Sequence, residues 1–158
     1  MGHVRAERAG ASQMDISERG QASRPTLLAE ISRQLIDAAV SEAVTRSVPV
    51  TVVTVDESGV VKALHRMDGA PLVSVQTAWH KAYAAAAIGM PTDDFYSAIE
   101  SDGAAVAAFA ARPALALIGG GLPVLADGLV AGAIGVAGAM TAAEDRQIAE
   151  VAVGRACW

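Results

Sequence analysis

Residues 122–137 read LPVLADGLVAGAIGVA, and this stretch decides the fold. It holds two runs of small aliphatic residues, 122–126 and 129–137, which are separated only by Asp127 and Gly128. An Asp-Gly pair between two apolar runs is a strong signal for a two-residue β-hairpin turn. We therefore expect two antiparallel strands joined by a tight turn.

The residues on either side of this hairpin predict a further strand and a closing helix. Residues 114–118 are apolar and lead through three glycines into the hairpin, so we interpret them as a strand followed by a glycine turn. Downstream of the hairpin, Thr141 and Glu144 have the spacing of a capping box. That spacing predicts a helix from there to about residue 156.

The first half of the chain predicts a second hairpin between two long helices. Residues 50–55 and 60–66 are interpreted as strands around a turn that ends at Gly59. Apolar residues at helical spacing, with Pro25 in the first turn, predict a helix over about 25–47. Another long helix is expected over 72–88, stopped by Gly89, and two short helices follow it to about residues 100 and 110.

The helix expected over 72–88 has two different faces. Its larger apolar residues share one face, in the pattern of a helix that covers a core: Leu72, Val75, Trp79, Ala82, Tyr83 and Ala86. Ser74, Thr77 and Lys81 lie on another face at offsets of three and four. This polar stripe is either a solvated surface or a place where the helix contacts a ligand.

The order of the expected elements is helix, two strands, helices, three strands and helix. Because hairpins connect the strands, the predicted fold class is α+β, with an antiparallel five-stranded sheet flanked by helices in a profilin-like layout. Residues 1–24 are polar and lack periodicity, so we expect a disordered or loosely attached arm. Residues 25–158 are expected to form a single domain.

Composition and charge exclude several classes of function. The net charge of −5 argues against a nucleic-acid partner, because a phosphate-binding protein normally carries a basic patch. A single cysteine, Cys157, cannot form an intramolecular disulfide or a multi-cysteine metal site. No apolar run is long enough to span a membrane, and the N-terminus has no apolar signal region, so a cytoplasmic location is expected.

Several ordered motifs between residues 27 and 153 resemble the GlcG/HbpS-like family of small proteins, which is related to the C-terminal domain of PduO. The motifs are residues 64–71 (LHRMDGAP), 81–86 (KAYAAA), 89–92 (GMPT), 119–123 (GGGLP), 132–138 (GAIGVAG) and the closing Glu144-Asp145 pair. The resemblance implies an α/β fold and homo-oligomers. It also implies binding of haem or a related tetrapyrrole in some members, and it assigns no haem ligand to a residue of this chain.

Three charged residues are candidates for binding a cofactor or another small ligand. Arg66 could hold a carboxylate or a propionate through its planar guanidinium, with Asp68 beside it. Alternatively, Arg66 and Asp68 pair with each other or shape the turn at Gly69. Lys81 could contact an anionic ligand, or act as a base if it is buried.

His65 and His80 are the candidate haem ligands outside the N-terminal arm, because imidazole suits haem iron. They are 15 residues apart on different predicted elements, so they have no local metal-binding spacing. Either histidine could equally be a surface or structural residue. Apart from haem, we expect no metal and no other cofactor, and no set of catalytic residues can be assembled from the sequence.

Three functions remain open at this point. The leading hypothesis is a small-ligand-binding protein, with haem or a related tetrapyrrole as the ligand. The alternatives are an enzyme of a catabolic or biosynthetic small-molecule pathway that uses the same pocket, and an accessory subunit without a ligand. Alanine runs at residues 84–87 and 104–111 leave helices apolar on more than one face, so we expect a homo-oligomer.

Overall fold

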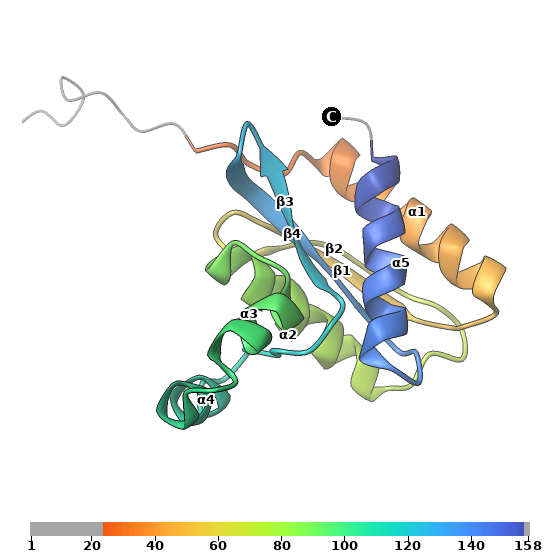
Figure 1. Ribbon diagram of the computed structural model, residues 1–158. Helices are drawn as coiled ribbons and strands as arrows, with labels where there is room; N and C mark the ends of the chain where they lie inside the picture. The colour runs from red at the N-terminus through yellow and green to blue at the C-terminus, as the bar shows by residue number, and fades with distance from the viewer. Residues whose placement is uncertain (1–23, 157–158) are drawn as a thin grey trace, which may run out of the picture.

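The computed structural model describes residues 24–156 (Figure 1). Cys157 and the predicted arm, apart from Arg24, lie outside the described residues. The elements in chain order are α1 (Ala29–Arg46), β1 (Thr51–Asp56), β2 (Val61–Arg66), α2 (Val73–Ile88), α3 (Thr92–Ile99), α4 (Gly103–Ala110), β3 (Gly121–Ala126), β4 (Leu129–Ala137) and α5 (Ala142–Arg155). No helix within residues 24–156 is both long enough and apolar enough to cross a membrane.

Antiparallel pairing in the order β2-β1-β4-β3 builds the sheet. The central strand β1 is buried and β-branched almost throughout, as suits a strand covered on both faces. The edge strand β2 is largely exposed. The Asp127-Gly128 turn joins β3 to β4, and both of its residues have positive φ angles, as a type I′ hairpin turn requires.

The predicted fifth strand, residues 114–118, is wrong, and the sheet of the described chain has four strands. Residues 114–118 are irregular and only partly buried, and Ala114 has a φ of 65°, which is incompatible with a strand. The carbonyl of Ile118 accepts a hydrogen bond from Thr92 Oγ1 instead of from a neighbouring strand. The sequence pattern was apolar enough for a strand, but no strand pairs with it.

Helices α1 and α5 cover one face of the sheet, which we call the α1–α5 face, and Figure 1 shows them together on one side. The core here is built from aliphatic side chains, including Leu35, Val52, Ile134 and Ile148, all fully buried. The first helix begins at Ala29 rather than near residue 25. The segment before it is extended, and Leu27 N donates to Ala131 O of β4.

Helix α2 covers the opposite face of the sheet, which we call the α2 face, and packs chiefly on β4, β1 and β3. Contact is made through small residues. A Cβ atom on Gly135 of β4 would overlap the carbonyl oxygen of Ala78 and the backbone nitrogen of Ala82. The helix therefore lies close against the strand, and its alanines, not its large apolar residues, form the buried face.

The predicted amphipathic face of α2 is consequently only partly correct. Ala82 and Ala86 are buried, but Leu72 is 78% exposed and Trp79 is 38% exposed. Ser74 and Lys81, which the sequence put on the polar stripe, are buried. This inversion arises because the glycine of β4 admits small side chains and excludes large ones.

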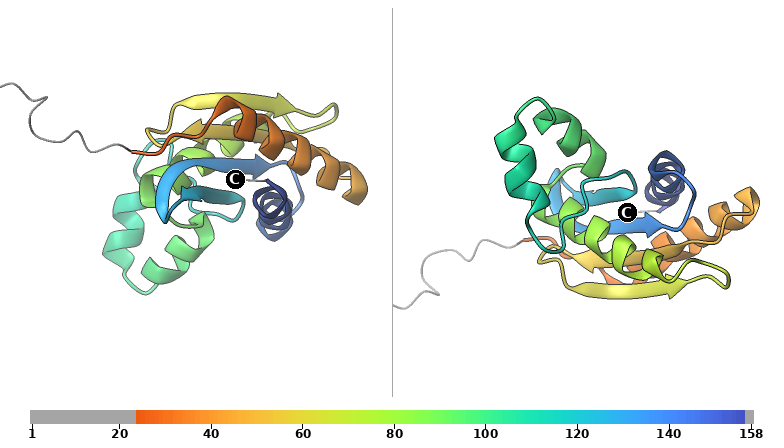
Figure 2. Two further views of the ribbon diagram at one scale, coloured as in Figure 1. Left: turned by 90° about the horizontal axis from the view of Figure 1, so that it is seen from above. Right: turned by 90° about the horizontal axis from the view of Figure 1, so that it is seen from below.

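Helices α3 and α4 form a separate pair at the β3 edge of the sheet, away from β2, as both views of Figure 2 show. Phe95 of α3 and Phe109 of α4 pack edge to face with ring centroids 5.0 Å apart. Asp102 caps α4 by accepting hydrogen bonds from Ala104 N and Ala105 N. Although α4 is apolar, none of its residues is buried within the described chain.

Candidate functional site

A buried ion pair between Lys81 and Asp145 is the most unusual chemical feature of the structure. Lys81 Nζ lies 2.7 Å from Asp145 Oδ2 and donates a second hydrogen bond of 2.9 Å to Val136 O. The Lys81 side chain is 1% exposed and that of Asp145 is 6% exposed. A lysine is almost never buried to this degree unless it is paired.

Three elements hold the pair in place. Lys81 comes from the middle of α2, and Asp145 comes from the first turns of α5, which begins where Thr141 Oγ1 accepts a hydrogen bond from Glu144 N. The other oxygen of Asp145 accepts a hydrogen bond of 3.0 Å from Ala139 N in the connection after β4. The carboxylate is therefore fixed on both oxygens.

The glycine turn before β3 makes room for the lysine. Gly120 has a φ of 115°, and a Cβ atom there would lie 3.0 Å from Lys81 Nζ and closer still to Val136 O. A Cβ on Gly121 would overlap the carbonyl oxygen of Lys81. Gly120 and Gly121 thus allow close approach to Lys81 of α2, whereas Gly119 lies against the backbone of Ala142 at the start of α5. The glycines lead into strand β3, so no helix follows them that could bind a phosphate.

Burial and pairing act in opposite directions on the protons of this pair. Burial lowers the pKa of the Lys81 ammonium, and the Asp145 and Asp93 carboxylates oppose that fall. Burial also raises the pKa of Asp145, against the effect of Lys81. Because desolvation is the largest influence on both groups, the pair is easier to neutralise by internal proton transfer than two exposed groups are.

Lys81 and Asp145 line an open pocket of about 270 Å³ between α2, the connection after β4 and the start of α5. Ser74 and Thr77 line the same pocket, so the structure brings together the whole polar stripe predicted from the sequence. Ser74 Oγ donates to Pro71 O and therefore accepts from Thr51 Oγ1, which leaves it no free hydrogen. Most of the remaining wall is apolar: Val73, Ile118, Ala137 and Met140.

The other predicted site residues lie outside this pocket. Arg66 donates two hydrogen bonds to Ala70 O and so closes the turn that contains Asp68. Both side chains are exposed. Among the described residues Arg66 forms no ion pair with Asp68, so of the two alternatives the turn-shaping role is the one that the structure shows for Arg66.

The two histidines lie on opposite sides of the sheet. His65 pairs with Val52 across β1 and β2 and so points to the α1–α5 face. His80 lies on α2, and its ring is tilted against that of Trp79 at a centroid distance of 5.1 Å. The two imidazoles therefore do not converge on one site within a single chain. No cluster of three or more His, Cys, Asp or Glu residues suited to a metal occurs within residues 24–156.

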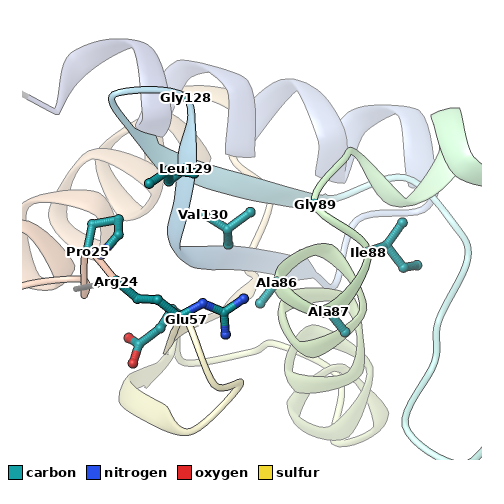
Figure 3. A pocket seen from close by; sticks show the side chains of 10 residues that line it. All are labelled: Arg24, Pro25, Glu57, Ala86, Ala87, Ile88, Gly89, Gly128, Leu129 and Val130. Carbon is teal, nitrogen blue, oxygen red and sulfur yellow. The ribbon is translucent and has the colours of Figure 1, made fainter. Parts of the chain in front are cut away.

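A second pocket, of about 320 Å³, lies where the C-terminal end of α2 meets the β3–β4 hairpin. Figure 3 shows the Arg24 side chain beside Glu57 and extending toward Ala86, with Ala87 and Val130 also lining the pocket. A hydrogen bond from Thr26 is the main influence that lowers the pKa of Glu57, and the nearby Arg24 charge adds a smaller effect in the same direction. None of the candidate ligand-binding residues predicted from the sequence lines this pocket.

Asp145 is the residue that sequence reasoning missed. It was considered only as part of an acidic pair beside a helix cap, because nothing local connects it to Lys81, 64 residues away. The sequence feature that could have pointed to Asp145 is its position in the closing Glu144-Asp145 motif of the family pattern, in the helix that begins after Thr141. The sequence alone does not indicate which residue pairs with Lys81.

Comparison with known proteins places the chain among relatives of HbpS. Residues 27–154 match the family model described as haem degrading protein HbpS-like. The chain is 32% identical over 130 residues to an uncharacterized 15.0 kDa protein from the dhaT-dhaS intergenic region of Citrobacter freundii, covering 81% of this chain and 90% of that protein. It is 34% identical over 122 residues to the corrinoid adenosyltransferase PduO of the same organism, covering 76% of this chain but only 36% of PduO.

Solved structures give the same result. A double mutant of HbpS from Streptomyces reticuli superposes with a TM-score of 0.77 at 28% identity, covering 98% of this chain and 97% of that one. The ORFY protein of Klebsiella pneumoniae gives 0.79 at 26% identity over 86% and 93%. A complex of the PduO C-terminal domain with haem gives 0.73 at 29% identity over 82% and 94%. This chain therefore belongs to the HbpS-like family.

Proposed function

We propose that this protein is a homo-oligomer that binds a small ligand, and that haem or a related tetrapyrrole is the leading ligand. The observation that carries the proposal is the likeness to the PduO C-terminal domain, which was solved as a haem complex and matches 82% of this chain. The cytoplasmic location expected from the sequence stays a prediction.

Pocket size favours a binding surface that more than one subunit completes. The main pockets within the described residues measure about 210 to 340 Å³, which is below or just within the roughly 300–1,000 Å³ range that encloses drug-sized ligands. A flat tetrapyrrole macrocycle needs a wider contact than any of them offers. Such a ligand would therefore lie on an open surface that a second subunit covers.

One surface has the right chemistry for that role. We call it the β2–α2 surface, and it consists of Leu64, Arg66, Leu72 and Trp79. Leu64 and Arg66 pair with residues of β1 that point to the α2 face, yet α2 leaves β2 largely uncovered. Leu64, Leu72 and Trp79 are 47%, 78% and 38% exposed. Apolar side chains beside an arginine suit a macrocycle with propionate groups.

A haem titration of the full chain tests this proposal. We expect a Soret shift that saturates near one haem per subunit, and a weaker or altered Soret band in either His65→Ala or His80→Ala. Each histidine variant is the matched control for the other, since both remove one imidazole from the same protein. Soret spectra that are unchanged from wild type in both variants would exclude these histidines as ligands. The absence of saturable binding would reject the tetrapyrrole proposal.

Sedimentation velocity tests the oligomer separately. The apolar residues exposed on α2 and α4 favour self-association at low micromolar concentration. A single monomeric species under those conditions would reject both the oligomer and a ligand site shared between subunits.

A second candidate function, an enzyme of a small-molecule pathway, is favoured by one specific observation. Lys81, a buried lysine with a lowered pKa, lines a pocket together with its carboxylate partner. Perturbed titratable groups that converge in a pocket are typical of catalytic sites. This candidate does not depend on haem binding.

A further inference from the structure

We propose that Lys81 is an amine nucleophile that forms an imine with a small uncharged aldehyde or ketone bound in the pocket beside Asp145. This inference rests on the second candidate function above and names its substrate class and its reactive group. It is independent of the tetrapyrrole proposal, because none of the histidines and none of the β2–α2 surface takes part.

The geometry supplies an amine with one uncommitted hydrogen. A lysine ammonium has three N–H donors, and the hydrogen bonds of Lys81 use two of them, to Val136 O and Asp145 Oδ2. Asp145 Oδ2 lies 2.7 Å away, within range to accept a proton from Nζ. A lysine desolvated in this way is a recognised form of activated nucleophile, because the neutral amine attacks carbonyl carbon.

The reaction balances with the groups present. Asp145 accepts a proton from the ammonium, and the freed lone pair of Nζ forms a bond to the carbonyl carbon. The carbonyl oxygen then takes one of the two protons of the newly bonded Nζ and becomes the hydroxyl of a carbinolamine. That hydroxyl leaves as water after Asp145 returns its proton, and a protonated imine remains beside the Asp145 carboxylate. The net change is the condensation of one carbonyl group with Lys81 and the release of one water molecule.

Charge and size define the class of carbonyl compound. The positive charge of Lys81 is already balanced by Asp145, and Asp93 lies close enough to act on it electrostatically. Arg146, in turn, is paired with Asp93 and Asp94. Among the described residues, therefore, no unpaired cation lines the pocket to hold a carboxylate. The mostly apolar wall and a volume of about 270 Å³ suit an uncharged molecule of a few carbon atoms.

The chain itself provides the control for a trapping experiment, because it contains two lysines, Lys62 and Lys81. Lys62 is exposed on the edge strand β2, whereas Lys81 is buried. The full-length protein is incubated at pH 7 with a limiting amount of butanal and with sodium cyanoborohydride, which reduces imines to stable amines. Peptide mapping by mass spectrometry then gives the rate of modification of each lysine and of the amino terminus.

We expect Lys81 to be modified at least severalfold faster than Lys62, since burial lowers its pKa and so raises the fraction of neutral amine. Modification of Lys81 should continue at the same rate in Lys62→Arg. In denatured wild-type protein the selectivity should disappear, because both lysines then react alike. Modification confined to Lys62 and the amino terminus of the folded wild-type protein would overturn the proposal. So would an adduct on Lys81 that forms without reductant, because an imine requires reduction to become stable.

A matched pair of variants tests whether the pocket is the route to Lys81 while leaving Lys81 itself intact. Thr77 lines the pocket one helical turn before Lys81, whereas the neighbouring Gln76 is exposed and lies outside the pocket. We expect Thr77→Phe to slow modification of Lys81 at least severalfold and Gln76→Phe to leave it unchanged. Equal rates in the two variants would overturn the pocket assignment.

The outcomes separate this inference from the functions on which it was built. If Lys81 is modified but no turnover of any carbonyl compound is found, the imine stands and only the enzymatic function is rejected. If Lys81 is not modified, the inference is rejected while haem binding is unaffected, because the two experiments share no residue and no ligand.

Discussion

The two faces of the sheet are built on different principles. The α1–α5 face is filled by large aliphatic side chains, such as Leu35 and Ile148, and encloses an ordinary hydrophobic core. The α2 face is closed by alanines, valines and a backbone glycine, and it buries a lysine and an aspartate at one end. The α1–α5 face stabilises the domain by burying a large apolar area. The α2 face buries less apolar area because small side chains bring α2 close to β4, and it leaves a pocket with charged groups.

The comparison shows which face of the sheet leaves room for a pocket. Large side chains on the α2 face would fill the space that the Lys81 pocket occupies, and α2 could not approach β4 as closely. Because the α1–α5 face buries most of the large apolar side chains, the α2 face is free to bury groups that lower stability when isolated. The predictions below compare substitutions on the two faces.

The largest effect is expected when the lysine is removed and its partner remains. Lys81→Met leaves Asp145 buried without a counterion, and breaking a buried pair in this way typically costs about 3–5 kcal/mol. The measurement is the free energy of unfolding from chemical denaturation at pH 7. Lys62→Met is the control, and this exposed substitution should change stability by less than about 0.5 kcal/mol. Equal stabilities of the two variants would show that the buried pair is not formed.

A second pair of substitutions compares neighbouring residues of β4 that point to opposite faces. Gly135→Ala adds one carbon against the backbone of α2 and should cost about 3 kcal/mol, the upper end for overpacking. Ile134→Val removes one carbon from the α1–α5 core and should cost about 1 kcal/mol. Denaturation curves decide the order. If Ile134→Val proved the more damaging, helix α2 would have to lie further from the sheet than the structure places it.

The pH dependence of stability gives a third, smaller effect. The raised pKa of Asp145 stabilises the native state below its ordinary value of 3.8, and this contribution is lost as the pH rises through the folded-state pKa. The lowered pKa of Lys81 stabilises the native state above its ordinary value of 10.5, and this contribution is lost as the pH falls through the folded-state pKa. The contribution of the pair is therefore smallest between the two folded-state pKa values.

Subtracting a variant without either group isolates that contribution. The variant is Lys81→Met with Asp145→Leu, because replacing a buried pair by apolar residues often preserves folding. Asp93, which acts electrostatically on Lys81, and its partner Arg146 are present in both proteins. The difference in the free energy of unfolding should pass through a minimum near neutral pH. A maximum there would contradict the directions of both shifts.

Local signals in the sequence were enough to predict most of the fold. The Asp127-Gly128 turn, the cap at Thr141 and the stop at Gly89 are each determined by residues within a few positions of one another, and the structure confirms all three. The strand expected over residues 114–118 failed because a strand also needs a neighbour in the sheet, and composition does not show whether one exists.

The site was only half predictable for a related reason. Ser74, Thr77 and Lys81 were found because helical spacing gathers them on one face. The face that α2 buries was misjudged because the deciding residue, Gly135, belongs to another element and acts through the absence of a side chain. Asp145 was missed because a pair formed between α2 and α5 leaves no local pattern.

The smallest effect concerns the helix that carries Asp145. Thr141 Oγ1 accepts a hydrogen bond of 3.2 Å from Glu144 N and so caps α5 at its first turn. Thr141→Ala removes that acceptor and should lower the free energy of unfolding by about 1 kcal/mol. Thr141→Ser keeps the hydroxyl and should differ from wild type by only a few tenths of a kcal/mol. Because α5 also packs on α1, the loss should appear in global unfolding, measured by denaturation. If alanine and serine prove equally stable, Thr141 does not cap α5, and the position of Asp145 must depend on its bonds to Lys81 and Ala139 alone.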